Sequence, residues 1–255
     1  MGDRQTTRAA GLARRAARSV VRDRRYTPAV AQGDRAARRG RFITIEGPDG
    51  SGKTTLARLL HARLRGADIE AVLTREPGGT PLGERIRGIV LDATAERHQL
   101  DAVTDALLFS AARARHVEEV IEPALARADV VVCARFADST LAYQGYGGGV
   151  PLDTLRDIQR LATGGLVPDL TILLDLPVAD GLSRKAAEIT RFEDSFDEAF
   201  HERVRAGFLE MAAAEPNRWV VVDARTGEAE VLEAVVRACA RFPELAALAA
   251  EPGPV

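Results

Sequence analysis

The chain has 255 residues, 46% of them apolar, which is enough to bury one complete α/β core. It contains no uninterrupted run of about eighteen apolar residues, so we expect no transmembrane helix and no membrane partner. The two cysteines, Cys133 and Cys239, lie far apart in apolar surroundings, which argues against a disulfide or metal framework and fits a reducing cytoplasm.

The net charge of −2 hides an uneven distribution. Residues 1–40 hold eleven Arg, three Asp and no Lys, a balance of +8, which leaves −10 for the rest of the chain. This segment has little apolar periodicity, so we interpret it as a disordered extension or as the product of a mis-set translation start. An arm that binds nucleic acid or another acidic partner stays open, as does a targeting segment; elsewhere we expect no nucleic-acid binding.

The first predicted strand covers residues 42–45 and leads directly into a glycine loop. Gly47 begins the pattern Gly-x-x-x-x-Gly-Lys-Thr, and apolar residues then recur at helical spacing. Strand, loop and helix in this order are the context of a phosphate-binding loop, because backbone N–H groups and the helix N-terminus face the phosphate oxygens. The predicted ATP-binding residues are Gly47, Pro48, Asp49, Gly50, Ser51, Gly52, Lys53, Thr54 and Thr55.

Two side chains of this loop have chemical roles that follow from their type and position. Lys53 is placed to reach the β- and γ-phosphates, and we predict it to be catalytic. The hydroxyl of Thr54 is placed to ligate Mg²⁺, the cofactor that we expect to accompany ATP. The sequence therefore predicts binding of a nucleoside triphosphate.

Strands and helices alternate through the rest of the chain. The further predicted strands cover residues 69–74, 129–133, 169–176 and 219–222. The predicted helices cover residues 81–91, 101–128 with a break or kink at Pro123, a segment up to 161 that follows a glycine-rich turn at 145–149, a segment through 185, a segment up to 214, and 228–240. This alternation predicts a doubly wound parallel sheet, an α/β fold, with a frayed tail at residues 241–255.

Polar residues outside the loop differ in how strongly they indicate a functional role. Arg135 follows the predicted strand at 129–133, and ligands bind at the carboxyl ends of strands in open α/β sheets. The four histidines lack the spacing of metal ligands, and we interpret them as solvated or packing residues. They are His61, His98, His116 and His201.

With these elements placed, residues 41–240 resemble the thymidylate kinase family. The resemblance rests on the motifs EGPDGSGKTT (46–55), TREPGGTPLGERIR (74–87), LLFSAARARH (107–116), DSTLAYQGYGGG (138–149), PDLTILLDL (168–176) and RFEDS (191–195). It implies a P-loop NTPase fold with a five-stranded parallel sheet, flanking helices and a short LID. It also implies phosphorylation of dTMP to dTDP with ATP and Mg²⁺, and a homodimer.

The resemblance assigns the ends of the acceptor nucleotide to polar side chains. Asp49 matches a carboxylate that contacts the 3′-hydroxyl region of the dTMP sugar, and Arg75 belongs to a loop that lines the acceptor site. Arg87 matches a position near the thymine or its phosphate edge. Arg135 matches the arginine that holds the dTMP phosphate, and we include it among the predicted catalytic residues.

The resemblance also assigns residues to the base and the sugar. Phe109 matches the aromatic ring that stacks on thymine, and Arg113, one helical turn later, matches the guanidinium that bonds O4 of the base. Thr140 and Gln144 match polar residues that read the base edge. Tyr143 matches the ring that crowds the 2′ position of the sugar and so favours deoxyribose.

Two departures from the family pattern bear on catalysis. Ala134 stands where the family has an Asp that helps to organise Mg²⁺, and such losses typically cost about ten- to a hundredfold. Gly50 follows the loop carboxylate where some families carry an Arg, so the catalytic arginines are expected in the LID. We predict Arg184 and Arg191 there, although Thr190 replaces the Asp that usually precedes the latter.

These departures leave alternatives to a working dTMP kinase. One is a catalytically weak paralogue that binds dTMP or a related nucleotide and serves as a sensor or a partner. Another is a kinase for a modified pyrimidine nucleotide, for which the contacts at Thr140 and Gln144 would be decisive.

Overall fold

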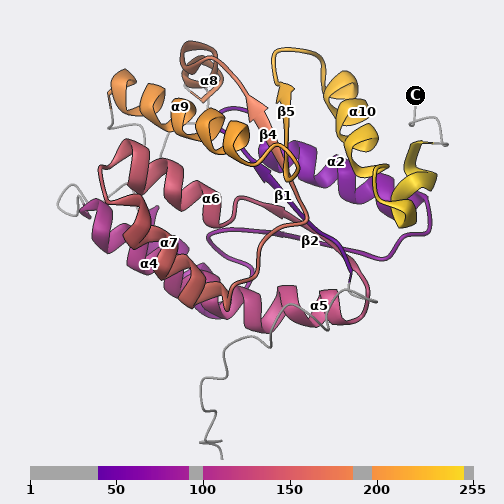
Figure 1. Cartoon of the computed structure of the whole chain (residues 1–255), viewed down its shortest axis with the longest axis horizontal. Coiled ribbons are helices and arrows are strands. Elements are labelled where there is room, and N and C mark those ends of the chain that lie inside the picture. Colours follow the sequence, from indigo (N-terminus) through magenta and orange to yellow (C-terminus); the bar gives the residue numbers. More distant parts are fainter. Residues whose placement is uncertain (1–39, 92–99, 186–196, 250–255) are drawn as a thin grey trace, which may run out of the picture. The chain divides into compact units, whose positions relative to one another are not determined.

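A parallel sheet of five strands forms the centre of the fold (Figure 1). The computed structural model describes residues 40–91, 100–185 and 197–249. The strands are β1 (Phe42–Glu46), β2 (Ala71–Arg75), β3 (Val130–Ala134), β4 (Leu170–Asp175) and β5 (Trp219–Asp223), and their order across the sheet is β2-β3-β1-β4-β5. All neighbouring strands are parallel. The predicted five-stranded parallel sheet is therefore confirmed, with bounds within two residues of those expected.

Helices cover both faces of this sheet. The α-helices are α2 (Lys53–Gly66), α3 (Pro81–Val90), α4 (Ala102–His116), α5 (Glu122–Ala126), α6 (Ala137–Thr140), α7 (Leu152–Thr163), α8 (Val178–Lys185), α9 (Glu198–Ala214) and α10 (Glu228–Cys239). Two π-helical segments, η1 (Val117–Ile121) and η2 (Leu141–Gly147), and one 3-10 helix, η4 (Pro243–Ala249), complete the described part. Within it, no helix combines the length and the apolar character that crossing a bilayer requires.

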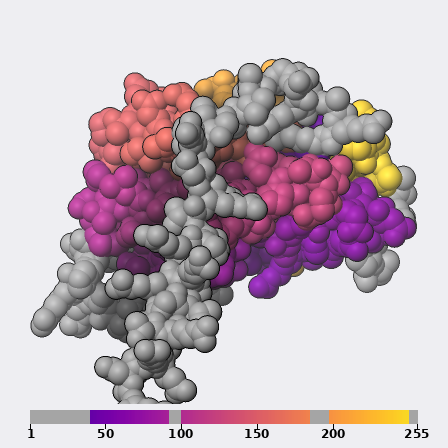
Figure 2. Space-filling view, turned by 90° about the horizontal axis from the view of Figure 1, so that it is seen from below, coloured from indigo at the N-terminus to yellow at the C-terminus, as the bar shows by residue number. Residues whose placement is uncertain are grey.

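Strand residues alternate between two apolar layers because successive side chains point to opposite faces. On one face, Ile43 and Ile45 pack with side chains of α2 and α10. On the other face, Phe42 packs with η1 and α5, and its ring meets Phe136 edge-on at 4.8 Å between centroids. Segments from the beginning, the middle and the end of the described chain share one surface of the molecule, as the indigo, magenta and yellow atoms of Figure 2 show.

A third apolar cluster carries the functional end of the sheet. Phe200 and Phe208 of α9 pack against Tyr143 of η2, at ring-centroid distances of 6.3 and 6.2 Å. Gly147 of η2 lies so close to α9 that an added Cβ would stand 2.6 Å from the Phe200 ring. This contact holds η2 against α9, and η2 carries two of the predicted substrate residues.

The interruption expected near Pro123 is present. Pro123 stands in the first turn of α5, and the π-helical η1 directly precedes this helix, because proline cannot donate the hydrogen bond of a continuous α-helix. Two other local predictions were wrong in detail. The expected glycine-rich turn at 145–149 belongs in part to η2, which ends at Gly147. The tail is not frayed over η4: Leu245 and Leu248 are buried there, and Arg63 donates to the Leu248 carbonyl at 2.8 Å.

Candidate active site

The glycine loop between β1 and α2 can be formed only without side chains at two positions. Gly47 has φ +143°, and an added Cβ would stand 2.5 Å from the Leu174 carbonyl oxygen of β4. Gly50 has φ +74°, and its Cβ would stand 2.3 Å from the Gly181 carbonyl oxygen of α8. Left-handed backbone and close approach both require glycine. The loop is thereby pressed against the carboxyl end of the sheet.

The N-terminus of α2 is electropositive. Its first turn contains no acidic residue, and no side chain caps it, because the N-cap is Gly52. Lys53 is buried in the loop and donates from Nζ to the Pro48 carbonyl at 2.6 Å and to Ser51 Oγ at 3.3 Å. Thr54 and Thr55 are exposed at the start of the helix. Backbone N–H groups, a lysine and hydroxyls are thus gathered where an anion can be bound.

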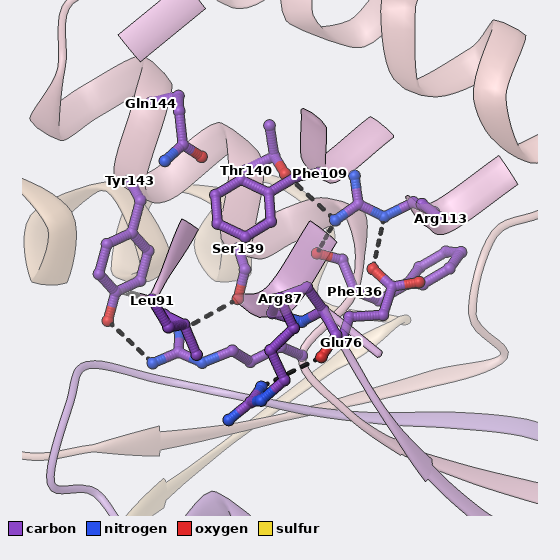
Figure 3. Close-up of a pocket in the computed structure, with 12 residues that line it drawn as sticks. Glu76, Arg87, Leu91, Phe109, Arg113, Phe136, Ser139, Thr140, Tyr143 and Gln144 are labelled. Carbon is purple, nitrogen blue, oxygen red and sulfur yellow. Dashed lines mark hydrogen bonds and ion pairs between the residues drawn. The ribbon is translucent and has the colours of Figure 1, made fainter. Parts of the chain in front are cut away.

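A second concave site lies beyond the ends of β2 and β3 and encloses about 520 Å³ of empty space, part of it open to solvent (Figure 3). Its lining residues are Glu76, Pro77, Arg87, Leu91, Phe109, Arg113, Arg135, Phe136, Ser139, Thr140, Tyr143 and Gln144. Three aromatic rings and three guanidinium groups share this wall, a combination suited to a flat ligand that carries negative charge.

Arg135 connects this pocket with the glycine loop. It follows β3 with φ +67°, a left-handed conformation that is uncommon for a side chain other than glycine. Its guanidinium forms an ion pair with Asp49 of the loop. It also lies 4.9 Å from the ring centroid of Tyr143 and donates to the Tyr143 hydroxyl at 3.3 Å. A group held by Arg135 would therefore lie beside the loop.

Glu46 holds the strained segment after β3. It is fully buried at the end of β1 and accepts hydrogen bonds from the Phe136 backbone N–H at 2.7 Å and from Ser139 Oγ at 2.5 Å. Burial raises the pKa of this carboxyl from 4.5 to about 7, and the nearby negative charge of Asp138 adds to the rise. The Glu46 carboxyl thus fixes the segment that follows β3, through Phe136 and Ser139, which both line the pocket.

The predicted base-binding residues come together. Arg113 of α4 is 2% exposed and donates from Nη2 to Thr140 Oγ1 at 3.1 Å and from Nε to Glu76 at 2.7 Å. Phe109, one turn earlier on α4, is half-buried and faces the same space in Figure 3. Arg87 of α3 donates to the Pro77 carbonyl at 3.1 Å. Of the predicted acceptor residues, the pocket lining includes Arg87, Phe109, Arg113, Arg135, Thr140, Tyr143 and Gln144.

Asp49 and Arg75 are the two exceptions. Asp49 stays in the glycine loop and pairs with Arg135. The side chain of Arg75 is 45% exposed, pairs with Glu84 of α3 at 3.1 Å and does not line the pocket. The next residue, Glu76, does, because side chains alternate in direction along the extended end of β2. Sequence reasoning missed five lining residues: Glu76, Pro77, Leu91, Phe136 and Ser139. The signal for Glu76 and Pro77 was present in the same loop motif as Arg75.

A larger cavity, of about 880 Å³ including open solvent, borders the other side of the glycine loop. Its wall combines loop residues with Arg184 of α8 and with residues 226–228, where α10 begins. Arg184 donates from both terminal nitrogens to the Ala224 carbonyl at 3.3 Å. The predicted LID residues Arg191 and Thr190 lie outside the described residues.

The position of the missing carboxylate is apolar. Ala134 ends β3 and is buried in the core cluster of α2 and α10. Three neighbouring carboxylates are each engaged inside the protein: Asp49 with Arg135, Glu46 with Ser139, and Asp138 with Arg218 at 2.6 Å. Among the described residues, no group of three or more His, Cys, Asp or Glu could hold a metal ion.

The described histidines and the cysteines are buried or half-buried. His61 lies beside the Ala71 carbonyl at 3.2 Å, and both His116 and His201 are buried; His98 lies outside the described residues. Both cysteines are free thiols in the core, and burial raises the pKa of Cys239 to about 12.

Comparison with known proteins identifies the family of this chain. A family model for thymidylate kinases matches residues 45–235. The thymidylate kinase of Thermomicrobium roseum is 54% identical over 197 residues, 76% of this chain and 91% of that protein. That of Deinococcus radiodurans is 52% identical over 194 residues, with coverages of 75% and 92%. The crystal structure of thymidylate kinase from Ehrlichia chaffeensis is 35% identical, with a TM-score of 0.58 over 72% of this chain and 92% of that chain.

These alignments extend over nearly the whole length of the relatives, and the matched residues include both the glycine loop and the pocket that Arg135 joins to it. The resemblance inferred from the motifs is therefore confirmed, and the chain belongs to the thymidylate kinase family.

Proposed function

We propose that this chain transfers the γ-phosphoryl group of ATP to dTMP, giving ADP and dTDP. One observation carries the proposal: Arg135, at the mouth of the aromatic pocket, forms an ion pair with Asp49 of the phosphate-binding loop. A nucleotide whose base enters the pocket and whose phosphate meets Arg135 would present that phosphate to the end of a triphosphate in the loop. In-line transfer requires this juxtaposition of acceptor and donor.

The donor half of the site follows from the loop. The backbone amides of residues 47–55 and Lys53 bind the triphosphate, and the cavity beside residues 226–228 receives the nucleoside. The exposed hydroxyl of Thr54 is an oxygen donor of the kind that Mg²⁺ prefers, so the ion would be held by Thr54 and by the phosphates. When bound, Mg²⁺ neutralises charge on the phosphate groups.

The acceptor half follows from the pocket. Phe109 stacks on the pyrimidine, Arg113 and Thr140 meet its C4 edge, and Gln144 reads the remaining edge. Tyr143 crowds the 2′ side of the sugar. Arg135 binds the phosphate, with Asp49 near the 3′-hydroxyl; the role of Arg75, which faces Glu84, stays a prediction.

The chemistry needs no general base, because the attacking phosphate oxygen is already ionised. That oxygen forms a bond to the γ-phosphorus while the bond to the β–γ bridging oxygen breaks, and ADP leaves with the electron pair. Lys53, Arg135, Arg184 and Arg191 supply positive charge to the transferring group, so catalysis consists of positioning and electrostatic stabilisation.

The test is a coupled ADP-release assay on the full chain with dTMP, dUMP, dCMP and a 5-modified pyrimidine nucleotide as acceptors. We expect dTMP to be preferred, with a turnover within about a hundredfold of the usual 1–100 s⁻¹ of kinases. Tight dTMP binding in calorimetry without ADP release would instead identify the chain as a nucleotide-binding sensor or partner.

Ala134 provides a second test of the same proposal. If the family carboxylate organises the ion and Arg135, then Ala134→Asp raises kcat, by up to about tenfold to a hundredfold. Ala134→Asn, of the same size without the charge, is the matched control. A rate that does not rise in Ala134→Asp contradicts our account of this position and leaves the acceptor assignment intact.

We also propose a homodimer formed through helices that flank the sheet. Exposed apolar side chains on three helices support it, of which α4 packs against both α3 and α7: Leu82, Ile89, Val103, Leu107 and Leu161. The kinase domain spans residues 41–240, and the two free, buried thiols support a reducing cytoplasm as its compartment. The same assay on a chain that begins at Arg41 tests the domain boundary.

A further inference from the structure

The guanidinium of Arg113 is held from several sides inside the protein. Nε donates to Glu76 Oε2 at 2.7 Å, Nη1 donates to Gln159 Oε1, and Nη2 donates to the Phe136 carbonyl and to Thr140 Oγ1, both at 3.1 Å. These bonds use four of the five N–H groups of an arginine. The loop after β2, helix α7 and the α6 region thus fix the side chain of Arg113, which belongs to α4.

Glu76 and Gln159 are themselves held by buried partners. The second oxygen of Glu76 lies 3.0 Å from Nδ1 of His116, which is 0% exposed, and His116 Nε2 lies 2.6 Å from Thr74 Oγ1. A carboxylate only accepts hydrogen bonds, so Nδ1 of His116 carries the hydrogen and donates a hydrogen bond to Glu76. On the other side, Gln159 Nε2 donates to Ser110 Oγ at 2.9 Å.

We propose that Glu76, His116 and Gln159 are positioning residues that aim Arg113 at the acceptor base and thereby set acceptor selectivity. The inference rests on the proposed function, in which Arg113 meets the C4 edge of the pyrimidine. The hydrogen bond with Thr74 orients the His116 ring, and His116 in turn orients the Glu76 carboxylate. Glu76 and Gln159 then bind different nitrogens of the guanidinium, Nε and Nη1. Four rotatable bonds of the arginine are immobilised before the ligand arrives, which lowers the entropic cost of binding.

The same arrangement leaves donors for a ligand. Thr140 Oγ1 accepts from Arg113, so its own O–H is not used by that bond, and the four bonds of Arg113 leave one of its five N–H groups over. Both residues line the pocket and can therefore donate to a ligand there. A 4-keto pyrimidine offers an oxygen acceptor at that edge, whereas a 4-amino pyrimidine offers a donor and leaves the protein groups unpaired.

Stability alone is a weak reason for this network. The attraction within a buried ion pair is largely offset by the cost of removing both charges from water. Orientation of the guanidinium is the effect that apolar residues of similar volume would not supply. A positioning role predicts changes in acceptor affinity and selectivity, whereas a merely structural role predicts changes in stability.

The experiment compares His116→Asn with His116→Leu in the full chain. Both replacements have nearly the same size and both lose the ring, but only Asn keeps an N–H near the place of Nδ1. We expect KM for dTMP to rise about tenfold or more in His116→Leu and less than threefold in His116→Asn. KM for ATP should stay unchanged in both, and the preference for dTMP over dCMP should fall only in His116→Leu.

A second pair tests the opposite side of the guanidinium and decides the matter if His116→Leu does not fold. Gln159→Glu keeps an accepting oxygen for Arg113, and Gln159→Leu does not. We expect only Gln159→Leu to raise KM for dTMP and to lower the preference over dCMP. His61→Leu removes the contact of a histidine on α2 with the Ala71 carbonyl of β2, neither of which lines the pocket, and should leave KM for dTMP unchanged.

The inference is overturned if the paired variants share the same KM for dTMP and the same preference over dCMP while their Tm values fall alike. That result would identify a structural network only. A wild-type chain that releases no ADP with dTMP would instead contradict the proposed function, so the two failures are distinguishable.

Discussion

Glu46 shows how one buried carboxyl shapes the site without touching the pocket. It ends β1 and is bonded to Phe136 and Ser139, which lie more than 85 residues later in the chain. Through them it holds Arg135 in its left-handed backbone conformation, φ +67°. The carboxyl is fully buried, and its pKa of about 7 is raised first by burial and then by the charge of Asp138.

This pKa predicts a measurable pH dependence of stability. Because the folded-state pKa lies above the unfolded value of 4.5, the folded protein binds the proton more tightly. The contribution is fully present below pH 4.5 and is lost as pH rises through about 7, an effect of about 3 kcal/mol. Glu46→Gln removes this titration, so its free energy of unfolding should fall less between pH 4.5 and 8.

Urea unfolding across this range checks the prediction. Asp105, whose pKa burial raises to about 6, titrates in both proteins, so the difference between the two curves isolates Glu46. Parallel curves for Glu46→Gln and the wild type would show that Glu46 does not carry the pH dependence.

At the scale of elements, helix caps and π-helical segments determine where the functional side chains are placed. α3 begins after Thr80, whose hydroxyl accepts from the Gly83 backbone N–H at 3.0 Å, and this helix carries Arg87 to the pocket. η2 interrupts the α-helical repeat where Tyr143 and Gln144 lie, and π-helical turns often occur at functional sites. The pocket therefore depends on how these elements begin and pack.

The cap of α3 can be tested with a conservative pair. Thr80→Ala removes the accepting hydroxyl and should lower the free energy of unfolding by about 1 kcal/mol, since that is the typical worth of an N-cap. Thr80→Ser keeps the hydroxyl and should cost clearly less. Midpoints of urea unfolding at unchanged m-value measure both, and equal losses in the two variants would mean that the lost methyl group, not the cap, matters.

The whole molecule leaves an apolar face that a second copy would cover. Ile89 of α3 and Leu107 of α4 are 59% and 53% exposed, and these helices pack side by side. We expect sedimentation equilibrium to give a dimer for the wild type and a monomer for the double variant Ile89→Glu, Leu107→Glu, because burying two carboxylates at an interface is costly. Val221→Glu on β5, at a side chain 50% exposed, should remain dimeric.

A wild-type protein that sediments as a monomer would contradict the proposed homodimer. A double variant that stays dimeric would place the interface elsewhere on the surface and leave the kinase proposal untouched.

By itself the sequence determined the elements whose signals are local. The glycine spacing of residues 47–52 predicts the phosphate-binding loop, because glycine is the residue that adopts left-handed backbone without steric cost. The left-handed backbone of Arg135 had no such signal. The β-branched run of β3 and the strand–helix alternation predict the parallel sheet, because buried strands have continuous apolar sequences. The position of Arg135 after β3 followed from the same reasoning.

Only the tertiary structure decided which charges meet. Glu76 and Gln159 lie 37 and 46 residues from Arg113, and Asp49 lies 86 residues from Arg135, so no periodicity relates them. Likewise, the ion pair of Arg75 with Glu84 joins β2 to α3, and the sequence alone did not show that Arg75 would face Glu84 while Glu76 lines the pocket. Ion pairs and buried hydrogen bonds depend on distances between elements, and these distances are set when the helices pack on the sheet.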